Sequence, residues 1–224
     1  MNARSDECAY LEEPVVSLSP CWSSRVQVAV KRVLEFTISF AALFVLSPFC
    51  VLLAIAIKLS SPGPVFYRCN WVGQHGRPFV GYKFRSMVMD ADHKKFDLLT
   101  RNEMTGPVFK ITDDPRVTRL GSWMRRHSLD EIPQLFSVLK GDMSLVGPRP
   151  PLRTEYEHYA AWEKQKLLVK PGITCLWQVS GRNTICDFHE WVRLDFEYIS
   201  NWSLALDAVI LLKTVREVLA GSGK

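Results

Sequence analysis

An uncharged apolar run near the N-terminus limits what this chain can fold into. It extends from Phe36 to Ile57 without a charged residue, and about 20 apolar residues suffice to cross the hydrocarbon core of a bilayer. Ser47 and Pro48 lie near its middle. Pro48 removes one helical hydrogen bond and kinks a helix, and the Ser47 hydroxyl can bond to the carbonyl left without a donor. The run therefore predicts a membrane helix that is broken near its centre.

Positive charge stands at both ends of this run. Lys31 and Arg32 precede it, and Lys58 follows it. Because cationic flanks prefer the cytoplasmic side of a membrane, both ends favour the same side. We therefore expect a re-entrant helix over residues 31–58, which enters one leaflet, bends at Ser47 and Pro48, and returns. A plain single span is the alternative that composition leaves open.

The segments on either side of the membrane helix differ in character. Residues 1 to about 25 mix Ser, Pro, Glu and Cys without a helical or strand period, so we expect a disordered or loosely held tail over residues 1–30 and no signal peptide. Residues 59–224 suffice for one cytosolic domain with its own core. The fold class expected is α+β: a re-entrant helix, then a small, mainly helical domain with a short β-hairpin and amphipathic interfacial helices.

Charge and cysteine content narrow the range of partners. The formal charge of +5 suits contact with anionic lipid, nucleotide or phosphate. The chain carries no helix-turn-helix, zinc-finger or aromatic RNA-binding signature, so we expect no nucleic acid as a partner. Its six cysteines form no C-x-x-C pair, and one lies inside the apolar run. This pattern predicts reduced thiols in a cytosolic setting without a metal cluster.

A β-hairpin is expected directly after the membrane helix. Residues 60–64 are rich in Ser, Pro and Gly and predict a turn. Residues 65–67 and 79–85 have strand composition, and the Gly- and Pro-containing segment 73–78 joins them. Alternation along the second strand places Lys83 and Arg85 on one face. Lys83 could then point into a phosphate site or lie on an ordinary solvated strand face, and the strand pattern by itself favours the solvated face.

Two adjacent carboxylates, Asp130 and Glu131, are the main candidates for catalysis. Ser128 and Glu131 have the spacing of a capping box, which predicts a helix from Ser128 to Gly141 with Pro133 near its start. The helix dipole would favour the ionised form of both acids in the first turn. Asp130 is then a candidate nucleophile and Glu131 a candidate ligand for Mg²⁺, with Mn²⁺ as the second possibility. The alternative is a pair of ordinary helix-start acids.

Arginines on both sides of these acids favour phosphate binding. Arg149 lies between two prolines, which restrict its backbone and so lower the entropic cost of a planar phosphate clamp. Arg125 precedes the acids in a segment with three further arginines. Instead of binding phosphate, Arg149 could be a solvated side chain on a stiff surface turn. Half of the arginines that precede the acids could contact only lipid or solvent.

The C-terminal third predicts three helices and two further candidates. Residues 153–168 form an amphipathic pattern, whose aromatics suit either the membrane interface or a core-facing stripe. Asp187 is expected to cap a second helix, and a third runs from about residue 204 to 219. Its Asp207 is either a second catalytic or metal-binding carboxylate or a helix-start acid. Arg182, in a Gly-containing loop, is a second candidate phosphate ligand.

Six segments, in this order along the chain, resemble one known family. They are Tyr82-Lys-Phe-Arg-Ser-Met87, Ser128-Leu-Asp-Glu-Ile-Pro-Gln-Leu135, Leu139-Lys-Gly-Asp-Met-Ser144, Gly147-Pro-Arg-Pro150, Lys170-Pro-Gly-Ile-Thr174 and Gln178-Val-Ser-Gly-Arg-Asn183. Together they are similar to the bacterial sugar transferases, the monotopic phosphoglycosyl transferases that act on polyprenyl phosphates. The resemblance covers about residues 31 to 220. Members of the family usually have Gly where this chain has Cys175, which leaves the geometry of the following loop less certain than the rest.

The resemblance implies a reaction and a location. The substrates would be a UDP-sugar and undecaprenyl phosphate, and the enzyme would lie in the bacterial cytoplasmic membrane, in contact with membrane lipid, with its active site on the cytoplasmic face. We hypothesise that Asp130 forms a covalent phosphosugar intermediate with help from Glu131 and Mg²⁺. Lys83, Arg125, Arg149, Arg182, Asp142 and Asp207 are the expected phosphate- or substrate-binding residues.

The sequence leaves the sugar, the reaction, the class of protein and the oligomeric state open. The chain has no multi-span N-terminal extension and in this resembles the short form of the family. By analogy, this suggests galactose or glucose phosphate for an exopolysaccharide; an N-acetylated sugar for O-antigen or glycoprotein glycan is the alternative. A glycosyl transfer that releases UDP in place of UMP is a second reaction. The alternative to an enzyme is a non-catalytic, membrane-associated interaction protein of the same fold. The oligomeric state is not fixed by the sequence.

Overall fold

The computed structural model describes residues 15–181, 184–221 and 223 and contains both helices and small sheets. Its helices are α1 (Pro20–Ser23), α2 (Arg25–Ser60), α3 (Ala91–Asp97), α4 (Arg119–Arg126), α5 (Leu135–Lys140), α6 (Arg153–Glu157), α7 (Ala161–Lys164), α8 (Phe188–Ser200) and α9 (Leu204–Ala220). Five short 3-10 helices join them: η1 (Gln74–Gly76), η2 (Leu99–Arg101), η3 (Leu129–Gln134), η4 (Gln165–Leu168) and η5 (Trp177–Val179). The strands are β1 (Phe66–Val72), β2 (Pro78–Phe84), β3 (Ser144–Val146) and β4 (Gly172–Thr174). This mixture of helix and sheet confirms the predicted α+β class.

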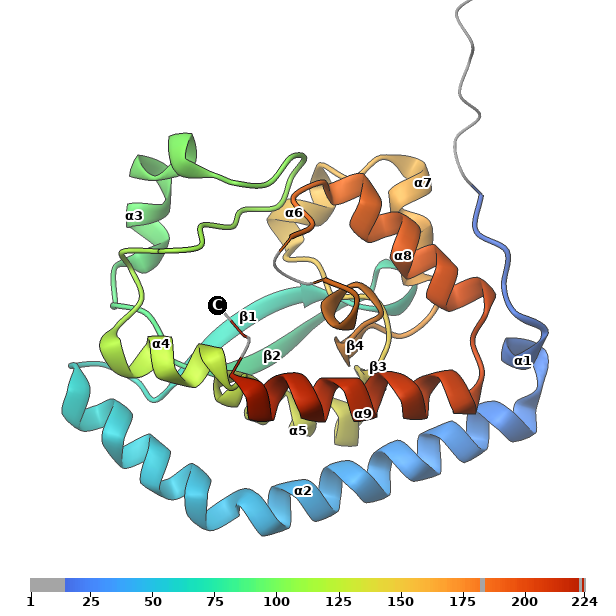
Figure 1. The fold of residues 1–224 in the computed structure, drawn as a ribbon, viewed down its shortest axis with the longest axis horizontal. Helices are drawn as coiled ribbons and strands as arrows, with labels where there is room; N and C mark the ends of the chain where they lie inside the picture. Colours follow the sequence, from blue (N-terminus) through green and yellow to red (C-terminus); the bar gives the residue numbers. More distant parts are fainter. Residues whose placement is uncertain (1–14, 182–183, 222, 224) are drawn as a thin grey trace, which may run out of the picture.

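Helix α2 contains the whole apolar run and bends near its middle. Figure 1 shows it as two legs along the lower edge of the molecule. Pro48 lies inside the helix and cannot donate to the carbonyl of Phe44, four residues earlier. The Ser47 hydroxyl donates to that carbonyl at 2.8 Å, as the sequence predicts. The bend therefore has an identified cause, and the freed carbonyl keeps a partner.

Both legs of α2 pack against the same domain, while the middle of the helix is exposed. Leu53 and Ile57 in the second leg are 4% and 1% exposed and pack with Phe84 and Met124. In contrast, Phe44 and Val45 are 73% and 72% exposed. Only 11% of the most apolar window of α2 is buried. A helix this long and apolar is consistent with membrane association, whereas the core helix of a soluble protein would be mostly covered.

The predicted disorder of residues 1–30 is wrong from Val15 onward, and residues 1–14 lie outside the described residues. The Ser19 hydroxyl donates to the carbonyl of Trp202 at 2.9 Å. Trp22 stacks on Trp202 with ring centroids 4.0 Å apart. Helix α2 then begins at Arg25, because the Ser24 side chain accepts from the backbone N–H of Gln27. This segment lacks any hydrophobic periodicity, so its position on the domain comes from tertiary contacts such as those with Trp202.

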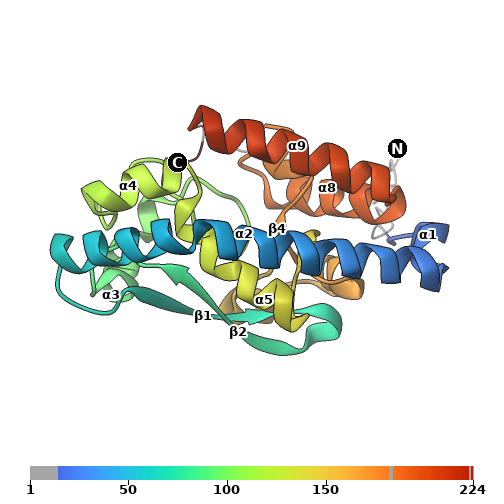
Figure 2. The same ribbon diagram turned by 90° about the horizontal axis from the view of Figure 1, so that it is seen from below.

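The strands form two separate small sheets. β1 and β2 pair antiparallel, with Phe66 opposite Phe84 and Val72 opposite Pro78, which confirms the predicted hairpin. β3 and β4 pair in parallel. Seen from below, in Figure 2, α2 passes in front of the domain, α5 crosses toward the hairpin, and α9 lies on the other side of α2. The largest core cluster lies between β3 and the C-terminal helices and includes Val146, Trp191 and Ile199.

Two helix predictions need correction. Residues 153–168 form α6, α7 and η4 rather than one helix. Their aromatics belong to the core, with Tyr159 only 4% exposed, and Lys166 is buried with its ammonium 2.6 Å from Asp195. The alternative of a core-facing stripe is therefore confirmed, and the interfacial reading of this segment is wrong. In contrast, α8, whose N-cap side chain at Asp187 accepts from His189, and α9 match the prediction.

The predicted capping box at Ser128 is also wrong. Ser128 adopts a left-handed backbone conformation with φ of 51°, and its side chain makes no capping hydrogen bond. Residues 129–134 form the 3-10 helix η3, and α5 begins only at Leu135. Pro133 explains the delay, because it has no N–H for an α-helical bond to Leu129. The left-handed turn at Ser128 joins α4 to η3, and Asp130 and Glu131 still fall in the first turn.

Candidate active site

A cavity of about 440 Å³ lies beside the hairpin and is lined by residues from distant parts of the chain. One wall comes from β1, β2 and the segment that follows β2. The opposite walls come from α3, from the end of α4, from η3 and from segments 149–155 and 172–178. Its charged, polar and aromatic lining includes Tyr67, Cys69, Trp71, Lys83, Arg85, Asp92, Arg125, Asp130, Glu131, Gln134, Arg149, Glu155 and Gln178.

The two predicted catalytic acids and Lys83 meet in this cavity. The Lys83 ammonium lies 2.6 Å from Oε1 of Glu131. Asp130 is 7% exposed, so the carboxylate is largely shielded from water. Burial alone would lower the pKa of Lys83, but the charges of Glu131 and then Asp130 raise it above its usual value. Lys83 thus remains cationic beside both acids, and the alternative of a solvated strand face is excluded.

Arginines complete the charged lining. Nη1 of Arg149 lies 3.5 Å from Oε2 of Glu155, and the same oxygen accepts from the backbone N–H of Leu152 at 2.9 Å. This double contact fixes the segment after Arg149 and holds its guanidinium at the cavity. Nε of Arg125 donates to the Ser86 hydroxyl at 2.9 Å. Lys83, Arg125 and Arg149 thus line the same cavity as the two acids, and phosphate binding by these residues stays a prediction.

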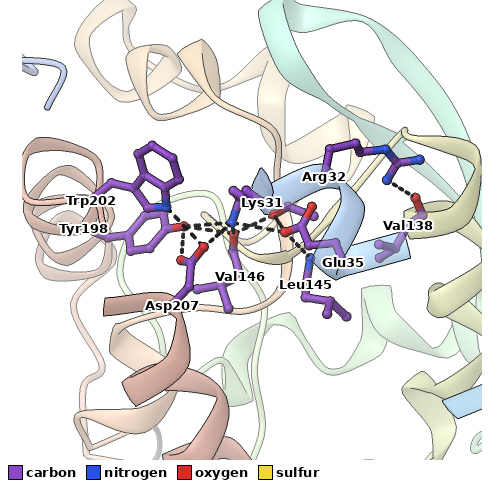
Figure 3. Close-up of polar contacts among 10 residues, drawn as sticks. Lys31, Arg32, Glu35, Val138, Leu145, Val146, Tyr198, Trp202 and Asp207 are labelled. Carbon is purple, nitrogen blue, oxygen red and sulfur yellow. Dashed lines mark hydrogen bonds and ion pairs between the residues drawn. The ribbon is translucent and has the colours of Figure 1, made fainter. Parts of the chain in front are cut away.

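The structure separates Asp207 from the cavity. Asp207 lies in the first turn of α9, where its Oδ2 is 2.5 Å from Nζ of Lys31. It also accepts from the Tyr198 hydroxyl at 2.8 Å and from Nε1 of Trp202 at 3.1 Å. Figure 3 shows this buried network between α2 and α9. Asp207 therefore joins α9 to the first leg of α2, and the structure does not bring it together with the other predicted ligands in the cavity.

Two other predicted ligands are not among the described residues that line this cavity. Asp142 lines a second cavity of about 380 Å³ and lies 3.3 Å from the ammonium of Lys140. Its position follows from the left-handed Gly141, with φ of 91°, which turns the chain away at the end of α5. Arg182 lies outside the described residues.

Three lining residues carry little signal of their role in the sequence. Glu155 is the first acid after the proline-flanked arginine and stands three residues after Leu152, the N-cap of α6. Gln178 begins one of the segments quoted above, and its Oε1 accepts from the backbone N–H of Cys175 at 3.1 Å. Trp71 has no sequence signal other than its place on the same face of β1 as Cys69.

The acids of the cavity fit a magnesium ion held in part by substrate. Among the described residues, no group of three or more His, Cys, Asp and Glu side chains is arranged to hold a metal. Mg²⁺ typically uses one or two carboxylates together with substrate phosphates, and the cavity supplies adjacent Asp130 and Glu131. A cation bound there would share the Glu131 carboxylate with Lys83. The donor set thus suits a metal that arrives with a phosphorylated substrate.

Comparison with known proteins identifies the chain's relatives. Residues 26–221 match the model of a family described as bacterial sugar transferase. The chain belongs to the bacterial sugar transferase family. A galactosyl transferase, CpsE, of Streptococcus agalactiae is 46% identical over 209 residues, which are 93% of this chain and 46% of the relative. An undecaprenyl-phosphate galactose phosphotransferase of Salmonella typhimurium is 43% identical over 198 residues, or 87% of this chain and 41% of the relative.

A shorter relative matches along most of its length. The exopolysaccharide production protein ExoY of Sinorhizobium fredii is 39% identical over 197 residues, which cover 86% of this chain and 87% of the relative. The chain spans slightly less than half the length of the first two relatives. Within this bacterial sugar transferase, parts of five of the six segments quoted from the sequence line the cavity. The exception is residues 139–144, and Lys170 of another segment joins Asp142 at the second cavity.

Proposed function

We propose that this bacterial sugar transferase moves a sugar-1-phosphate from a UDP-sugar to undecaprenyl phosphate and releases UMP. The observation that carries the proposal is the cavity in which buried Asp130 stands beside the Glu131–Lys83 ion pair and Arg149. Phosphoryl transfer requires a nucleophile and cations that neutralise the phosphate oxygens. The name of the Salmonella relative, an undecaprenyl-phosphate galactose phosphotransferase, supports the same lipid acceptor and the transfer of a phosphosugar.

The proposed reaction has two steps at one phosphorus atom. A carboxylate oxygen of Asp130 attacks the β-phosphorus, and the bond from that phosphorus to the oxygen bridging the two phosphates breaks, so that UMP leaves with the electron pair. An oxygen of polyprenyl phosphate then attacks the same phosphorus and releases the Asp130 carboxylate. Two substitutions allow the lipid to enter after UMP has left.

The other charged residues of the cavity would stabilise the negative charge that develops in both steps. Lys83 and Arg149 would bind the oxygens of the transferred phosphate, and Arg125 would extend the positive surface toward UMP. Glu155 holds Arg149 in place through its contacts with the guanidinium and with the backbone. A divalent cation held by Glu131, Mg²⁺ or Mn²⁺, would supply further charge neutralisation at the diphosphate.

The geometry of α2 supports a re-entrant membrane helix. Both legs pack on the same domain, exposed apolar residues run along both legs and across the bend, and Pro48 stands at the bend. Such a helix would hold the cavity at the cytoplasmic face of the bacterial cytoplasmic membrane, where a soluble UDP-sugar and a lipid phosphate can meet. We therefore expect reporters fused at residue 1 and at residue 224 to map to the same, cytoplasmic, face in living cells. Reporters on opposite faces would establish a single span.

Galactose phosphate or glucose phosphate is the proposed cargo, for the first membrane step of an exopolysaccharide. The names of two relatives contain galactose or galactosyl, and that of ExoY contains exopolysaccharide production. An N-acetylated sugar would fit the same phosphate chemistry. The choice among sugars would be made by uncharged lining residues such as Trp71 and Gln178.

The test is a measurement of uridine products in membranes that contain undecaprenyl phosphate and the overproduced protein. With a panel of UDP-sugars, we expect UMP from one sugar, most strongly from UDP-galactose or UDP-glucose, and no UDP. Release of UDP would indicate glycosyl transfer without the phosphate. No uridine product from any sugar would favour a non-catalytic interaction protein. Membranes without the protein serve as the control.

A further inference from the structure

The second cavity lies at the tip of the hairpin, outside the lining of the proposed active site. It stands between the loop that contains η1 and the chain that follows α5. The lining consists of Gly73, Gln74, His75, Arg77, Pro78, Phe79, Gly141, Asp142 and Lys170. Asp142 and Lys170 come from two of the six segments quoted from the sequence, and neither residue lines the first cavity. This second site therefore collects residues that the proposed reaction leaves without a role.

Positive charge dominates this cavity. Arg77 and Lys170 line it, and the guanidinium of Arg32, on α2, lies next to Gly141 of the lining. A Cβ atom on Gly141 would lie 3.4 Å from Nη2 of Arg32 and 3.7 Å from Nζ of Lys170. The two cations thus flank one backbone position, which carries no side chain. Asp142 is the only carboxylate in the described lining, and Lys140 already contacts it at 3.3 Å.

Arg32 is held in place by contacts that do not neutralise its charge. Arg32 donates to the carbonyls of Val138 and Leu139 at 2.5 and 2.8 Å, and a guanidinium has five N–H donors in all. Burial lowers the pKa of the Lys170 ammonium, and the charge of Arg32 lowers it further. An anion between the two groups would offset both effects. The carboxylates of Glu35 and Asp142 act against these two effects, but more weakly, so the pKa of Lys170 stays below its usual value. Positive charge therefore exceeds negative charge at this site, which favours an anion as its ligand.

The position of Arg32 on α2 indicates where such an anion would come from. Arg32 stands about one helical turn before Phe36, where the apolar run begins. On the same leg, Val33, Phe36 and Phe40 are 64%, 49% and 58% exposed. If α2 enters the membrane as set out under Proposed function, these cations lie at the depth of the headgroups, and the apolar leg beside them can contact a lipid chain.

We propose that the second cavity binds the phosphate group of a membrane lipid, with Lys170, Arg77 and Arg32 as its ligands. The lipid chain lies along the first leg of α2. The same chemistry describes two sources: polyprenyl phosphate, which the first cavity consumes, and an anionic phospholipid of the bilayer. In either case the site ties the hairpin tip and the end of α5 to the membrane surface.

The experiment is native mass spectrometry of the full chain released from nanodiscs of three compositions: phosphatidylcholine alone, phosphatidylcholine with phosphatidylglycerol, and phosphatidylcholine with undecaprenyl phosphate. The test variant combines Arg77→Gln with Lys170→Gln. The matched control combines Lys94→Gln with Arg153→Gln, which remove the same charge from exposed side chains of α3 and α6, on the side of the domain away from α2 (Figure 1). Arg32 is left unchanged because its bonds to α5 also hold α2 in place.

We expect the test variant to retain at least about tenfold less phosphate lipid than the wild type and the control, because two charge-assisted contacts are lost. Loss confined to undecaprenyl phosphate would identify the acceptor lipid, and loss of phosphatidylglycerol as well would identify the bilayer. Equal retention in all three proteins, or equal loss in the control, would overturn the site.

A parallel measurement of UMP release separates this site from the proposed reaction. If the wild type releases UMP but retains no more lipid than the test variant, the lipid site in the second cavity is refuted and the proposed reaction is not. Normal lipid retention by a wild type that releases no UMP from any UDP-sugar would refute the reaction alone.

Discussion

Replacing Asp130 by Asn is expected to lower the rate of phosphosugar transfer by roughly 10³-fold or more, because the variant lacks the attacking carboxylate. Asn has nearly the same shape as Asp, and Asp130 is only 7% exposed, so the fold should be retained. The measurement is UMP release from the preferred UDP-sugar in nanodiscs with undecaprenyl phosphate. The thermal unfolding temperature of the variant is measured alongside, to confirm that the protein is folded.

Glu131→Gln is the matched control for that variant. It changes the neighbouring carboxylate in the same way, keeps the nucleophile and removes one charge from the pair with Lys83. We expect a smaller loss of rate, together with a need for more divalent cation to reach half-maximal activity. An Asp130→Asn variant with full activity would rule out the proposed nucleophile. If the rate of UMP release falls equally in both variants and the cation dependence does not change, the two acids share one role.

Asp207→Ala is expected to destabilise the protein by about 3 kcal/mol, because it leaves buried donors without their acceptor. The ammonium of Lys31, the hydroxyl of Tyr198 and Nε1 of Trp202 all meet the Asp207 carboxylate. Lys31 would still have an ion pair with Glu35, whose Oε1 lies 3.0 Å from its ammonium. We therefore expect a loss of unfolding free energy at the lower end of the range for breaking a buried ion pair. The thermal unfolding temperature in detergent should fall by roughly 6–12 °C for a chain of this size.

Asp142→Ala is the comparison for this measurement. Asp142 is another acid predicted to bind substrate, but its side chain is 32% exposed and its Lys140 partner 65% exposed. Its replacement should change the unfolding free energy by no more than about 0.5 kcal/mol. An Asp207→Ala variant that unfolds at the wild-type temperature while losing transfer activity would restore Asp207 as a candidate for catalysis.

Local patterns were sufficient to predict the elements that build the candidate site. Strand alternation placed Lys83 on the correct face of the hairpin, and the first turn after Ser128 holds Asp130 and Glu131 as predicted. The serine and proline of the apolar run correctly indicated both the bend of α2 and the bond that satisfies the freed carbonyl. In each case the physical cause lies within a few residues of the feature that it explains.

The remaining errors come from contacts between residues far apart in sequence. Asp130 and Asp207 both stand in the first turn of a helix, so sequence alone cannot separate a cavity-lining acid from one that is paired with Lys31, 176 residues away. The order of residues 15–24 depends on Trp22 meeting Trp202. Lys166 appears on an amphipathic pattern, yet it is buried because Asp195 stands opposite. Residues 153–168 therefore fold into the core and not onto a membrane surface.

The covalent intermediate is tested most directly by the mass of the purified protein after incubation with the preferred UDP-sugar and no lipid acceptor. We expect a mass increase of one phosphosugar on the peptide that contains Asp130, its disappearance after undecaprenyl phosphate is added, and no such increase in Asp130→Asn. A wild type that releases UMP in the presence of acceptor, but never carries the phosphosugar without it, would contradict the covalent mechanism.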